Sequence, residues 1–210
     1  MNRLSPEDEY RFQQWKNLNF GLFIHYGLYS IPGGVWNGQN ITRGYSEQIL
    51  PNAPVPPEEY QALTASFDAK SFDAHRIVRL AKSAGMRYVV MTAKHHDGFC
   101  LFHTATTSYN SVNSAAGRDL LKELSEACRL EDMGFGVYFS LIDWHYPHAL
   151  PYQEDNCNAI PEKHHRYNMA QLTELLTSYG PICELWFDMG HPTRQQSREM
   201  RQLIRRCQPQ

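Results

Sequence analysis

Two adjacent histidines followed by an acid are the densest group of chemically capable side chains in this 210-residue chain. They occupy the run KHHDGF, in which His95 and His96 precede Asp97 and Gly98. Adjacent side chains of an extended segment point to opposite sides, so both histidines reach one site only if the backbone leaves the strand there, and a glycine helps it do so. Imidazole and carboxylate groups can bind hydroxyls or transfer protons. We therefore interpret this run as part of a functional site rather than as exposed loop residues.

The same residues give weaker support for a metal site. Ligand pairs in proteins usually recur at spacings that place both side chains on one face, and adjacent histidines do not have such a spacing. Asp143 and His145 do have it, so a metal held by these two residues and the histidine pair stays open as an alternative. Measured metal content would decide between a metal site and a site that works without a metal. Our expectation is that the chain uses neither a metal nor another cofactor.

A second candidate is an acid at the end of the apolar run LWFDMG. Burying a carboxylate is costly unless it is hydrogen-bonded or used in chemistry. By strand alternation, Trp186 and Asp188 lie on the same face. A carboxylate beside an aromatic surface suits a glycoside hydrolase, which needs a nucleophile or base near the anomeric carbon and an apolar surface for the sugar ring. The alternative is that Asp188 caps the helix that follows Pro192, and the residues alone do not separate the two.

Three more candidate residues lie in the first quarter of the chain. His25 interrupts the apolar run FGLFIHYGL, where a histidine satisfied within the core is the usual explanation. Its position at the end of that run makes ligand binding an equal alternative. Trp36 and Glu47 lie in the long proline-containing segment 31–57 that follows, and neither residue indicates a function by itself.

The elements that must position these residues are four short apolar runs. Near-continuous apolarity with β-branched and aromatic residues is typical of parallel strands covered on both faces. The predicted strands are residues 20–28, 87–94, 135–141 and 183–189. Helical periodicity lies between and after them, and the predicted helices are residues 72–84, 120–128, 169–176 and 200–207. The chain is therefore predicted to be an α/β protein with a parallel sheet.

Apart from Trp36 and Glu47, the candidate residues fall at or just after the carboxyl ends of the four predicted strands. They are His25, the run from His95 to Asp97, Asp143 and His145, and Asp188. Chemistry converges from several strand ends at that face of a (β/α)8 barrel, whereas a doubly wound open sheet uses one crevice. No glycine-rich phosphate loop follows any strand, so a nucleotide site is unsupported. A whole barrel typically has about 250 residues. We therefore predict half of a TIM-like (β/α)8 barrel, with about four strands, as a single domain over residues 1–210.

Composition excludes several other classes of protein. Hydrophobic residues make up 42% of the chain and the net charge is −2, which is not the composition of a disordered segment. Basic residues are spread along the chain, so we expect no nucleic-acid partner. No apolar run approaches the roughly 20 residues that span a bilayer, so we expect no membrane partner. The polar, acidic start MNRLSPEDEY lacks a signal-peptide core, and we expect a cytoplasmic location.

Five separated motifs carry a family resemblance. FGLFIHYGLYSIP, KHHDGFCLF, GRDLLKELSEAC, GVYFSLIDWHYP and ELWFDMG occur in the order and approximate spacing of the retaining α-L-fucosidases of glycoside hydrolase family 29. The segments VWNG and GYSEQI also resemble the family's long loop after the first strand. The resemblance covers nearly the whole chain and corresponds to the N-terminal half of the family's catalytic domain. It implies an irregular (β/α)8-like barrel that hydrolyses terminal α-L-fucose from fucosylated glycans with retention and without a metal.

The resemblance also implies roles for individual residues. Asp188 in WFDMG matches the catalytic nucleophile. The residues that match groups hydrogen-bonded to the fucose hydroxyls are His25, His95, His96 and Glu47. The residues that match aromatic positions lining the pocket are Trp36, Tyr138 and Trp186. Polar groups of this kind would distinguish hydroxyl orientations, and the aromatic rings would pack against the sugar ring and its methyl group.

The chain departs from the family pattern in one respect. The family's general acid/base follows the nucleophile in sequence, in the C-terminal half-barrel, and we expect that neither this half nor the β-sandwich domain of many members has a counterpart in these 210 residues. Retaining hydrolysis needs two carboxyl groups about 5 to 5.5 Å apart. Local candidates for the second carboxyl group are Asp97, Asp143 and Glu47, which the sequence does not rank.

Three hypotheses follow for how such a half-barrel would work. In the first, it is an enzyme whose barrel is completed by a second copy of the chain or by a complementary half-barrel chain, which hides the strand edges. The acid/base then comes from that partner or from a local acid. In the second hypothesis, the chain is a non-catalytic module that binds fucose. In the third, it is an inactive fragment of a longer fucosidase. Oligomeric state, fucose binding and turnover distinguish the three.

Overall fold

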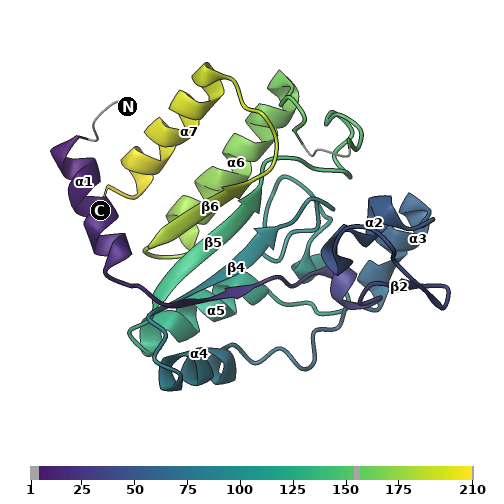
Figure 1. The fold of residues 1–210 in the computed structure, drawn as a ribbon, viewed down its shortest axis with the longest axis horizontal. Helices are drawn as coiled ribbons and strands as arrows, with labels where there is room; N and C mark the ends of the chain where they lie inside the picture. The colour runs from purple at the N-terminus through teal and green to yellow at the C-terminus, as the bar shows by residue number, and fades with distance from the viewer. Residues whose placement is uncertain (1–4, 154–156, 210) are drawn as a thin grey trace.

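A computed structural model describes residues 5–153 and 157–209; residues 1–4, 154–156 and 210 of the predicted domain lie outside the described residues. The described part is built on a curved parallel sheet. In spatial order, its strands are β1 (Gly21–Ile24), β4 (Tyr88–Lys94), β5 (Gly134–Ser140) and β6 (Glu184–Asp188). Spatial order follows chain order, and every neighbouring pair is parallel. This is how successive units of a (β/α) barrel are arranged, and it confirms the predicted strands (Figure 1).

Helices alternate with these strands, as the periodicity predicts. They are α4 (Ala74–Ser83), α5 (Leu120–Leu130), α6 (Glu162–Ser178) and α7 (Arg194–Cys207). Asp73, Asp119 and Thr193 cap three of them by accepting a hydrogen bond from a backbone N–H of the first turn. The helices lie along one side of the sheet, with α4 against α5 and α6 against α7 (Figure 1). Among the described residues, no helix is long and apolar enough to cross a membrane.

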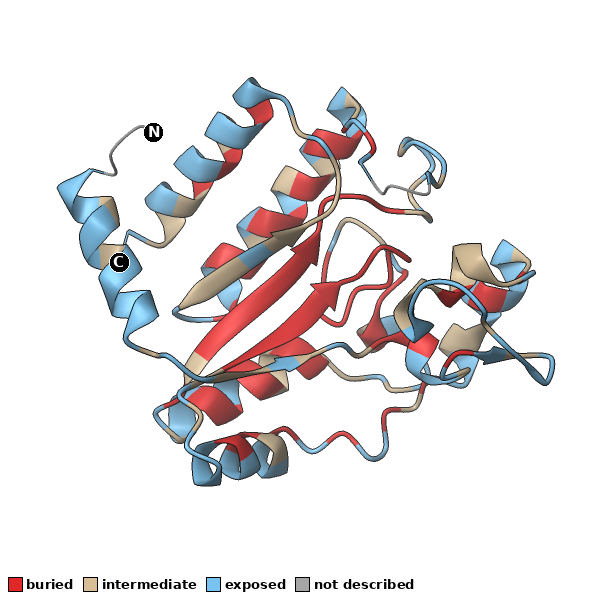
Figure 2. Ribbon diagram, in the orientation of Figure 1, coloured by how far each residue is buried: buried red, intermediate tan, exposed pale blue. Residues whose placement is uncertain are grey.

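Burial differs between the inner and the edge strands (Figure 2). The inner strands β4 and β5 are almost entirely buried, whereas β1 and β6 are mostly half-buried. Phe23 of β1 is 37% exposed and Trp186 of β6 is 47% exposed. The expectation that every strand is covered on both faces is therefore wrong for the edge strands. The reason is that β4 and β5 have a hydrogen-bonded strand on each side, whereas β1 and β6 have one on one side among the described strands.

The connection after β1 is irregular. Its two short strands, β2 (Val35–Trp36) and β3 (Gln39–Asn40), pair antiparallel. Its short helices are η1 (Leu28–Ser30), η2 (Ser46–Gln48), α2 (Ile49–Asn52), α3 (Pro57–Ala62) and η3 (Leu63–Ala65). A further turn, η4 (Ser111–Asn113), follows β4. Figure 1 shows α2, α3 and β2 beyond the carboxyl ends of the strands, so this connection borders any site located there.

A helix that the apolar patterns did not predict, α1 (Pro6–Lys16), precedes β1. It contains no buried residue. Asp8 forms ion pairs with Arg201 and Arg205 of α7, and Trp15 Nε1 donates a 2.7 Å hydrogen bond to a carboxylate at the start of β6. These contacts hold α1 at the amino end of the sheet, opposite the irregular connection (Figure 1).

Candidate active site

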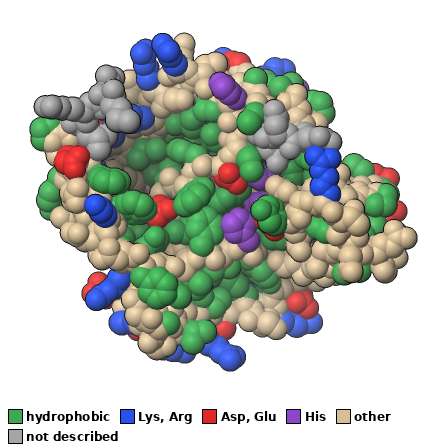
Figure 3. Space-filling model, in the orientation of Figure 1, with side chains coloured by type: hydrophobic (Ala, Val, Ile, Leu, Met, Phe, Trp, Pro, Cys, Tyr) green, Lys and Arg blue, Asp and Glu red, His purple; other side chains and the backbone are tan. Residues whose placement is uncertain are grey.

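The chemically capable side chains meet at the carboxyl ends of the parallel strands. In chain order they are His25 after β1, His95 and His96 after β4, Tyr138 within β5 and Asp188 at the end of β6. In the view of Figure 3, histidine and acidic side chains gather near the centre of the molecule among hydrophobic side chains. Parallel strands end at one edge of a sheet, which is why residues far apart in the sequence become neighbours here.

A β-bulge at the end of β4 brings both adjacent histidines into the site. Thr92 pairs with one residue of β5 and Lys94 with the next, so one extra residue is inserted between them. The strand ends at Lys94, and the turn from His95 to Gly98 closes with a 3.1 Å backbone hydrogen bond. Gly98 has a φ of +77°, which residues with a Cβ rarely adopt. The ring centroids of His95 and His96 are 4.0 Å apart, so the backbone does leave the strand as the sequence requires.

Aromatic and imidazole rings form the wall of the site. The His95 ring stacks on Tyr138, with ring centroids 5.6 Å apart and an interplanar angle of 15°. The His25 ring is tilted against both, at 5.6 Å from His95 and 5.2 Å from Tyr138. Phe23, two residues before His25, contacts Trp186 edge to face at 5.2 Å. The wall therefore combines apolar ring faces with polar ring nitrogens, as small-molecule sites commonly do.

Asp188 is held in place by a hydrogen bond from the neighbouring strand. Tyr138 Oη donates to Asp188 Oδ2 at 2.7 Å, and His96 Nε2 lies 3.7 Å from the same oxygen. The Asp188 side chain is 29% exposed, so a ligand can reach the carboxylate. The helix-capping alternative is wrong, because α7 starts at Arg194 and is capped by Thr193.

Burial keeps the site histidines uncharged near neutral pH. It lowers the pKa of His96 to about 4 and the pKa of His95 well below its usual range. It also lowers the pKa of His25, against the opposing influence of the negative charges on Glu47 and Asp188. Each imidazole therefore presents one N–H donor and one acceptor nitrogen.

The hydrogen bonds of Ser140 assign the tautomer of His96. Ser140 Oγ donates its only proton to Ile142 O at 2.8 Å. The 2.7 Å contact between Ser140 Oγ and His96 Nδ1 must then be donated by an Nδ1–H group. Nε2 of neutral His96 is left as an acceptor, 3.7 Å from Asp188 Oδ2. Two acceptors that face each other favour a ligand that brings a hydroxyl donor to this gap.

The loop residues Glu47 and Trp36 lie to the side of this cluster. Glu47 is half-buried in η2, and its charge raises the pKa of His25 in opposition to burial, which places the carboxylate in the neighbourhood of the site. Trp36 is half-buried in β2 and packs against the core, and its Nε1 has no hydrogen-bond partner. Trp36 makes no ring contact with the other described site residues. The structure thus brings Glu47 toward His25 but does not join Trp36 to the cluster.

The two other candidate acids are engaged by the chain itself. Asp97 is buried and accepts hydrogen bonds from Tyr60 Oη at 2.7 Å and from a backbone N–H, and burial raises its pKa to about 7. Asp143 is buried in an ion pair with Lys94, whose Nζ lies 3.4 Å from Asp143 Oδ2. Neither carboxylate is open to a substrate. Of the three local candidates for an acid/base, only Glu47 is partly exposed.

The alternative metal site is not assembled. Asp143 pairs with Lys94, and the exposed His145 stacks on the Tyr109 ring with centroids 4.1 Å apart. Within residues 5–153 and 157–209, no three or more His, Cys, Asp or Glu side chains are grouped so that they could hold a metal ion. The D-x-H spacing therefore does not bring these residues together with the histidine pair.

Sequence patterns missed three residues that build the site. Phe23 lies two positions before His25, and Ser140 two positions after Tyr138, so strand alternation could have placed both on the site face. Tyr29 packs its ring 5.1 Å from His95, but it comes from the irregular connection after β1, where no periodic signal exists.

Fold and site together define the class of this protein. A curved parallel sheet of successive β/α units, with polar side chains gathered at the strand carboxyl ends, is the arrangement of (β/α)-barrel domains with a functional site at that face. Within this class the match is to one family, since the family model described as Alpha-L-fucosidase covers residues 2–210. The chain belongs to the α-L-fucosidase family, as the motifs indicate.

Curated relatives match this chain over part of their own length. Plasma alpha-L-fucosidase of Rattus norvegicus is 36% identical over 180 residues, and plasma alpha-L-fucosidase of Homo sapiens is 32% identical over 180 residues. Both alignments cover 80% of this chain, but they cover 38% of the rat protein and 37% of the human protein. The chain therefore spans well under half the length of these relatives.

Solved structures show the same partial match. The alpha-L-fucosidase AlfC from Lactobacillus casei, in complex with alpha-L-fucose product, has a TM-score of 0.85 and 32% identity, covering 95% of this chain and 68% of that chain. A bacterial fucosidase with a monovalent iminocyclitol inhibitor has a TM-score of 0.86 and 30% identity, covering 99% of this chain and 48% of that chain. These neighbours are fucosidase barrel domains of which this chain covers part, which confirms the predicted portion of a TIM-like barrel.

Proposed function

We propose that this chain forms the nucleophile and fucose-binding part of a retaining α-L-fucosidase that acts on fucosylated glycans. The observation that carries the proposal is the setting of Asp188 at the strand carboxyl ends. One of its carboxylate oxygens accepts the Tyr138 hydrogen bond, and the side chain remains partly exposed beside three uncharged histidines. Family membership and the solved complex of AlfC with alpha-L-fucose support the proposal.

In this proposal Asp188 attacks the anomeric carbon of the fucoside. The bond to the leaving oxygen breaks as the ester to Asp188 forms, and a second carboxyl group protonates the leaving oxygen. Water then attacks the anomeric carbon, gives its proton to that same group, and releases fucose and the Asp188 carboxylate. Because Tyr138 holds Oδ2, the carboxylate has a fixed orientation and Oδ1 is available for the attack.

The uncharged histidines suit both binding and nucleophilic attack. The acceptor Nε2 of His96 would take a hydrogen bond from a fucose hydroxyl, and His25 and His95 each offer one donor and one acceptor. A charged imidazolium beside Asp188 would stabilise the free carboxylate and weaken it as a nucleophile. The exposed ring of Trp186 supplies an apolar surface for the sugar ring and its methyl group.

We further infer that a completing half-barrel covers the open face of the sheet. β1 and β6 each have one hydrogen-bonded neighbour, and the exposed rings of Phe23 and Trp186 lie between them on the uncovered face. Unpaired strand edges and apolar surface are what such a half would cover. A second copy of this chain, or a complementary half-barrel chain, would pair both edges and supply the acid/base, for which Glu47 is the local alternative.

A second candidate function is a fucose-binding module without turnover. The observation that favours it is the burial of Asp97 and Asp143, which leaves Glu47 as the one partly exposed local acid among the three candidates. The ring wall and the neutral histidines need no acid/base to bind a sugar. In this case the chain would bind α-L-fucose reversibly and leave fucosides intact.

The deciding experiment is release of the chromophore from an aryl α-L-fucoside by the purified chain. We expect turnover that falls by at least about 10³-fold in Asp188→Asn, the loss typical of removing a nucleophile. Asp132→Asn, the same change at an exposed residue near the amino end of β5, is the matched control and should retain full activity.

Light scattering and calorimetric titration with α-L-fucose complete the test. A dimeric mass together with turnover supports completion of the barrel by a second copy. Fucose binding without turnover, even with an activated leaving group, would replace the enzyme by the binding module. A chain that neither binds nor turns over would be an inactive fragment, and the proposed function would then be wrong.

A further inference from the structure

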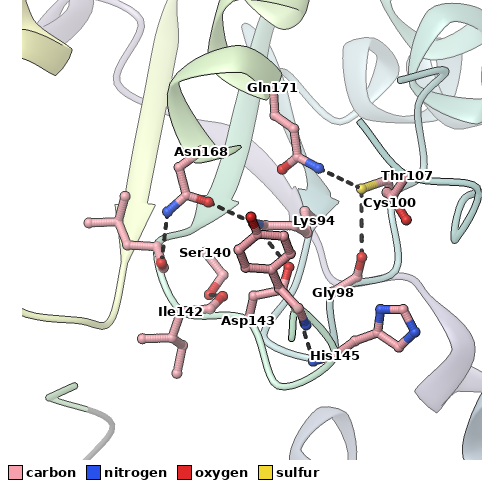
Figure 4. A network of polar contacts seen from close by, with 12 residues as sticks. Lys94, Gly98, Cys100, Thr107, Ser140, Ile142, Asp143, His145, Asn168 and Gln171 are labelled. Atoms are coloured by element: carbon pink, nitrogen blue, oxygen red, sulfur yellow. Dashed lines mark hydrogen bonds and ion pairs between the residues drawn. The ribbon is translucent and has the colours of Figure 1, made fainter. Parts of the chain in front are cut away.

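The end of β4 buries a charged side chain on the far side of the sheet from the site. Lys94 is 0% exposed, and the bulge after Thr92 pairs it with Phe139 of β5. Its side chain extends toward α6 rather than into the site (Figure 4). A buried ammonium group destabilises the fold unless it is paired and hydrogen-bonded. The surroundings of Lys94 must therefore compensate for its charge.

Polar and aromatic groups do compensate for it. Lys94 Nζ donates to Asn168 Oδ1 at 2.9 Å and lies 3.4 Å from Asp143 Oδ2. It also lies 4.5 Å from the ring centroid of Phe139 and 5.2 Å from that of Tyr167. Within the part of the chain that the structure describes, Asp143 Oδ2 accepts no hydrogen bond, and the ammonium group of Lys94 is its counter-charge.

Asp143 connects this network to His96. Its Oδ1 accepts hydrogen bonds from the backbone N–H groups two and three residues further on, at 2.9 and 2.8 Å, which folds the segment after β5 into a turn. Within that turn, Trp144 N donates to His96 O at 2.7 Å. A Cβ at Gly98 would overlap the Asp143 carboxylate, so the turns after β4 and β5 pack directly on each other.

Asn168 connects the same network to Asp188. Its Nδ2 donates to Leu141 O at 2.9 Å, and Leu141 N donates to the main-chain oxygen of Asp188 at 2.9 Å. One amide side chain thus joins the ammonium group of Lys94 to the backbone that carries the carboxylate. Both routes, to His96 and to Asp188, begin at Lys94.

We propose that Lys94 is a positioning residue, which acts through Asp143 and Asn168 to hold His96 and Asp188 in register from the helix side of the sheet. Lys94 touches no substrate, because it is enclosed between the sheet and α6. The quantity that it controls is the 3.7 Å separation of His96 Nε2 and Asp188 Oδ2. What these two residues do with a sugar rests on the proposed function.

A charge suits this task better than an apolar side chain. A buried ammonium group that shifts away from Asn168 and Asp143 leaves two buried charges unpaired, which is strongly unfavourable. Apolar cores tolerate substitution and repacking, and they lose a unique arrangement before they lose stability. The ion pair therefore selects one arrangement of the two turns, and with it one arrangement of the site.

Lys94→Met in the full chain tests the proposal, because methionine fills similar space without the charge. We expect amide hydrogen exchange to quicken by about tenfold or more at Trp144 and Leu141, whose N–H groups donate to His96 and Asp188. Nitrogen-15 NMR of the His96 ring should show that the Nδ1–H tautomer loses its dominance. Affinity for α-L-fucose should fall by about tenfold, as expected when a binding group is displaced.

A second variant covers the case in which Lys94→Met does not fold. Asn168→Leu keeps both charges of the ion pair and removes the hydrogen bonds that join Asn168 to Lys94 and to Leu141. Because the Lys94–Asp143 pair remains, exchange should quicken at Leu141 and stay unchanged at Trp144. Glu199→Gln is the matched control. It weakens the 2.7 Å contact between Glu199 of α7 and His165 of α6, the helix that also carries Asn168, and it leaves the network around Lys94 intact. Both amides should then exchange as in the wild type.

Unchanged exchange at both amides and an unchanged His96 tautomer in folded Lys94→Met would overturn the proposal, even with a lower melting temperature, since Lys94 would then serve stability alone. Amide exchange at Leu141 as slow in Asn168→Leu as in the wild type would also overturn the proposal. If the wild-type chain does not bind α-L-fucose, the proposed function is wrong, while the exchange and tautomer measurements still decide whether Lys94 positions His96 and Asp188.

Discussion

The two ends of the parallel sheet are built in opposite ways. At the carboxyl end, Lys94, Asp97 and Asp143 are buried, and their contacts come from side chains and turns of several elements. At the amino end, α1 buries no residue and borders a cavity of about 1320 Å³, lined by side chains that include Trp15 and Leu185. In the ion pairs that hold α1, Arg201 and Arg205 are exposed and Asp8 is half-buried.

This difference shows where the fold requires exact geometry. A buried charge has few arrangements that satisfy it, so a buried polar network specifies one structure. An exposed ion pair is screened by water and salt, and it tolerates many arrangements at little cost. The candidate active site lies at the carboxyl end, which has the buried network. Three predictions test whether geometry is fixed more strictly at the carboxyl end than at the amino end.

The largest effect is expected for the pH dependence of stability at the carboxyl end. Burial raises the pKa of Asp97 from 3.8 to about 7. As pH rises, the Asp97 carboxyl loses its proton at a lower pH in the unfolded chain than in the folded chain. The free energy of unfolding therefore falls as pH rises from about 4 to 7, by at most about 4 kcal/mol. Asp97→Asn cannot ionise. Its free energy of unfolding, measured by urea titration at each pH, should therefore rise relative to the wild type across that window.

The histidines contribute with the opposite sign, which is why the comparison must be made between variants. Burial lowers the pKa of His96 from 6.5 to about 4, so the stability from its neutral form is present above pH 6.5 and lost as pH falls through that window. The two contributions overlap and partly cancel in the wild type. A constant difference between Asp97→Asn and the wild type from pH 4 to 8 would contradict the raised pKa of Asp97.

An intermediate effect is expected for the hydrogen bond to the candidate nucleophile. Tyr138→Phe removes the 2.7 Å hydrogen bond to Asp188 Oδ2 and leaves the ring stack on His95. This hydrogen bond fixes the orientation of the attacking carboxylate, and misplacing a reacting group by about 1 Å can cost about 10²-fold, so kcat/KM for an aryl α-L-fucoside should fall by roughly 10- to 100-fold. Tyr10→Phe, at an exposed tyrosine of α1, is the amino-end control and should leave kcat/KM unchanged.

The same contrast explains which parts of the fold could be predicted from the sequence. β4 and β5 are buried along nearly their whole length and therefore form near-continuous apolar runs, and the apolar residues of the covered helix α5 recur at helical spacing. Helix α1 buries nothing and lacks that period. Its start is marked instead by Ser5, whose side chain accepts a hydrogen bond from Asp8 N, and by a proline and acids in the first turn.

Within the site, spacing predicted which residues meet but not how they are held. That the histidine pair and Asp188 lie at one edge follows from their positions at strand ends, but both histidines enter the site because of the bulge in β4. The direction of Lys94 depends on a bulge in β4, and bulges have no apolar period that a sequence could show. Whether Asp188 caps the following helix could not be read from the sequence, and the structure shows that Thr193 caps α7 instead.

The smallest effect is expected at the amino end, where Asp8 joins α1 to α7. Arg205, Ser5 and Arg201 lower the pKa of Asp8 to about 2, so its contribution to stability is present above pH 3.8 and lost as pH falls toward 2. Asp8→Asn should lower the melting temperature slightly at low ionic strength, and the difference should vanish in 1 M salt because the pairs are exposed. Turnover of the aryl fucoside and protection of the Leu141 amide should stay as in the wild type. A loss of either would mean that α1 is coupled to the site, and the two ends of the sheet would then form one cooperative unit rather than two independent ones.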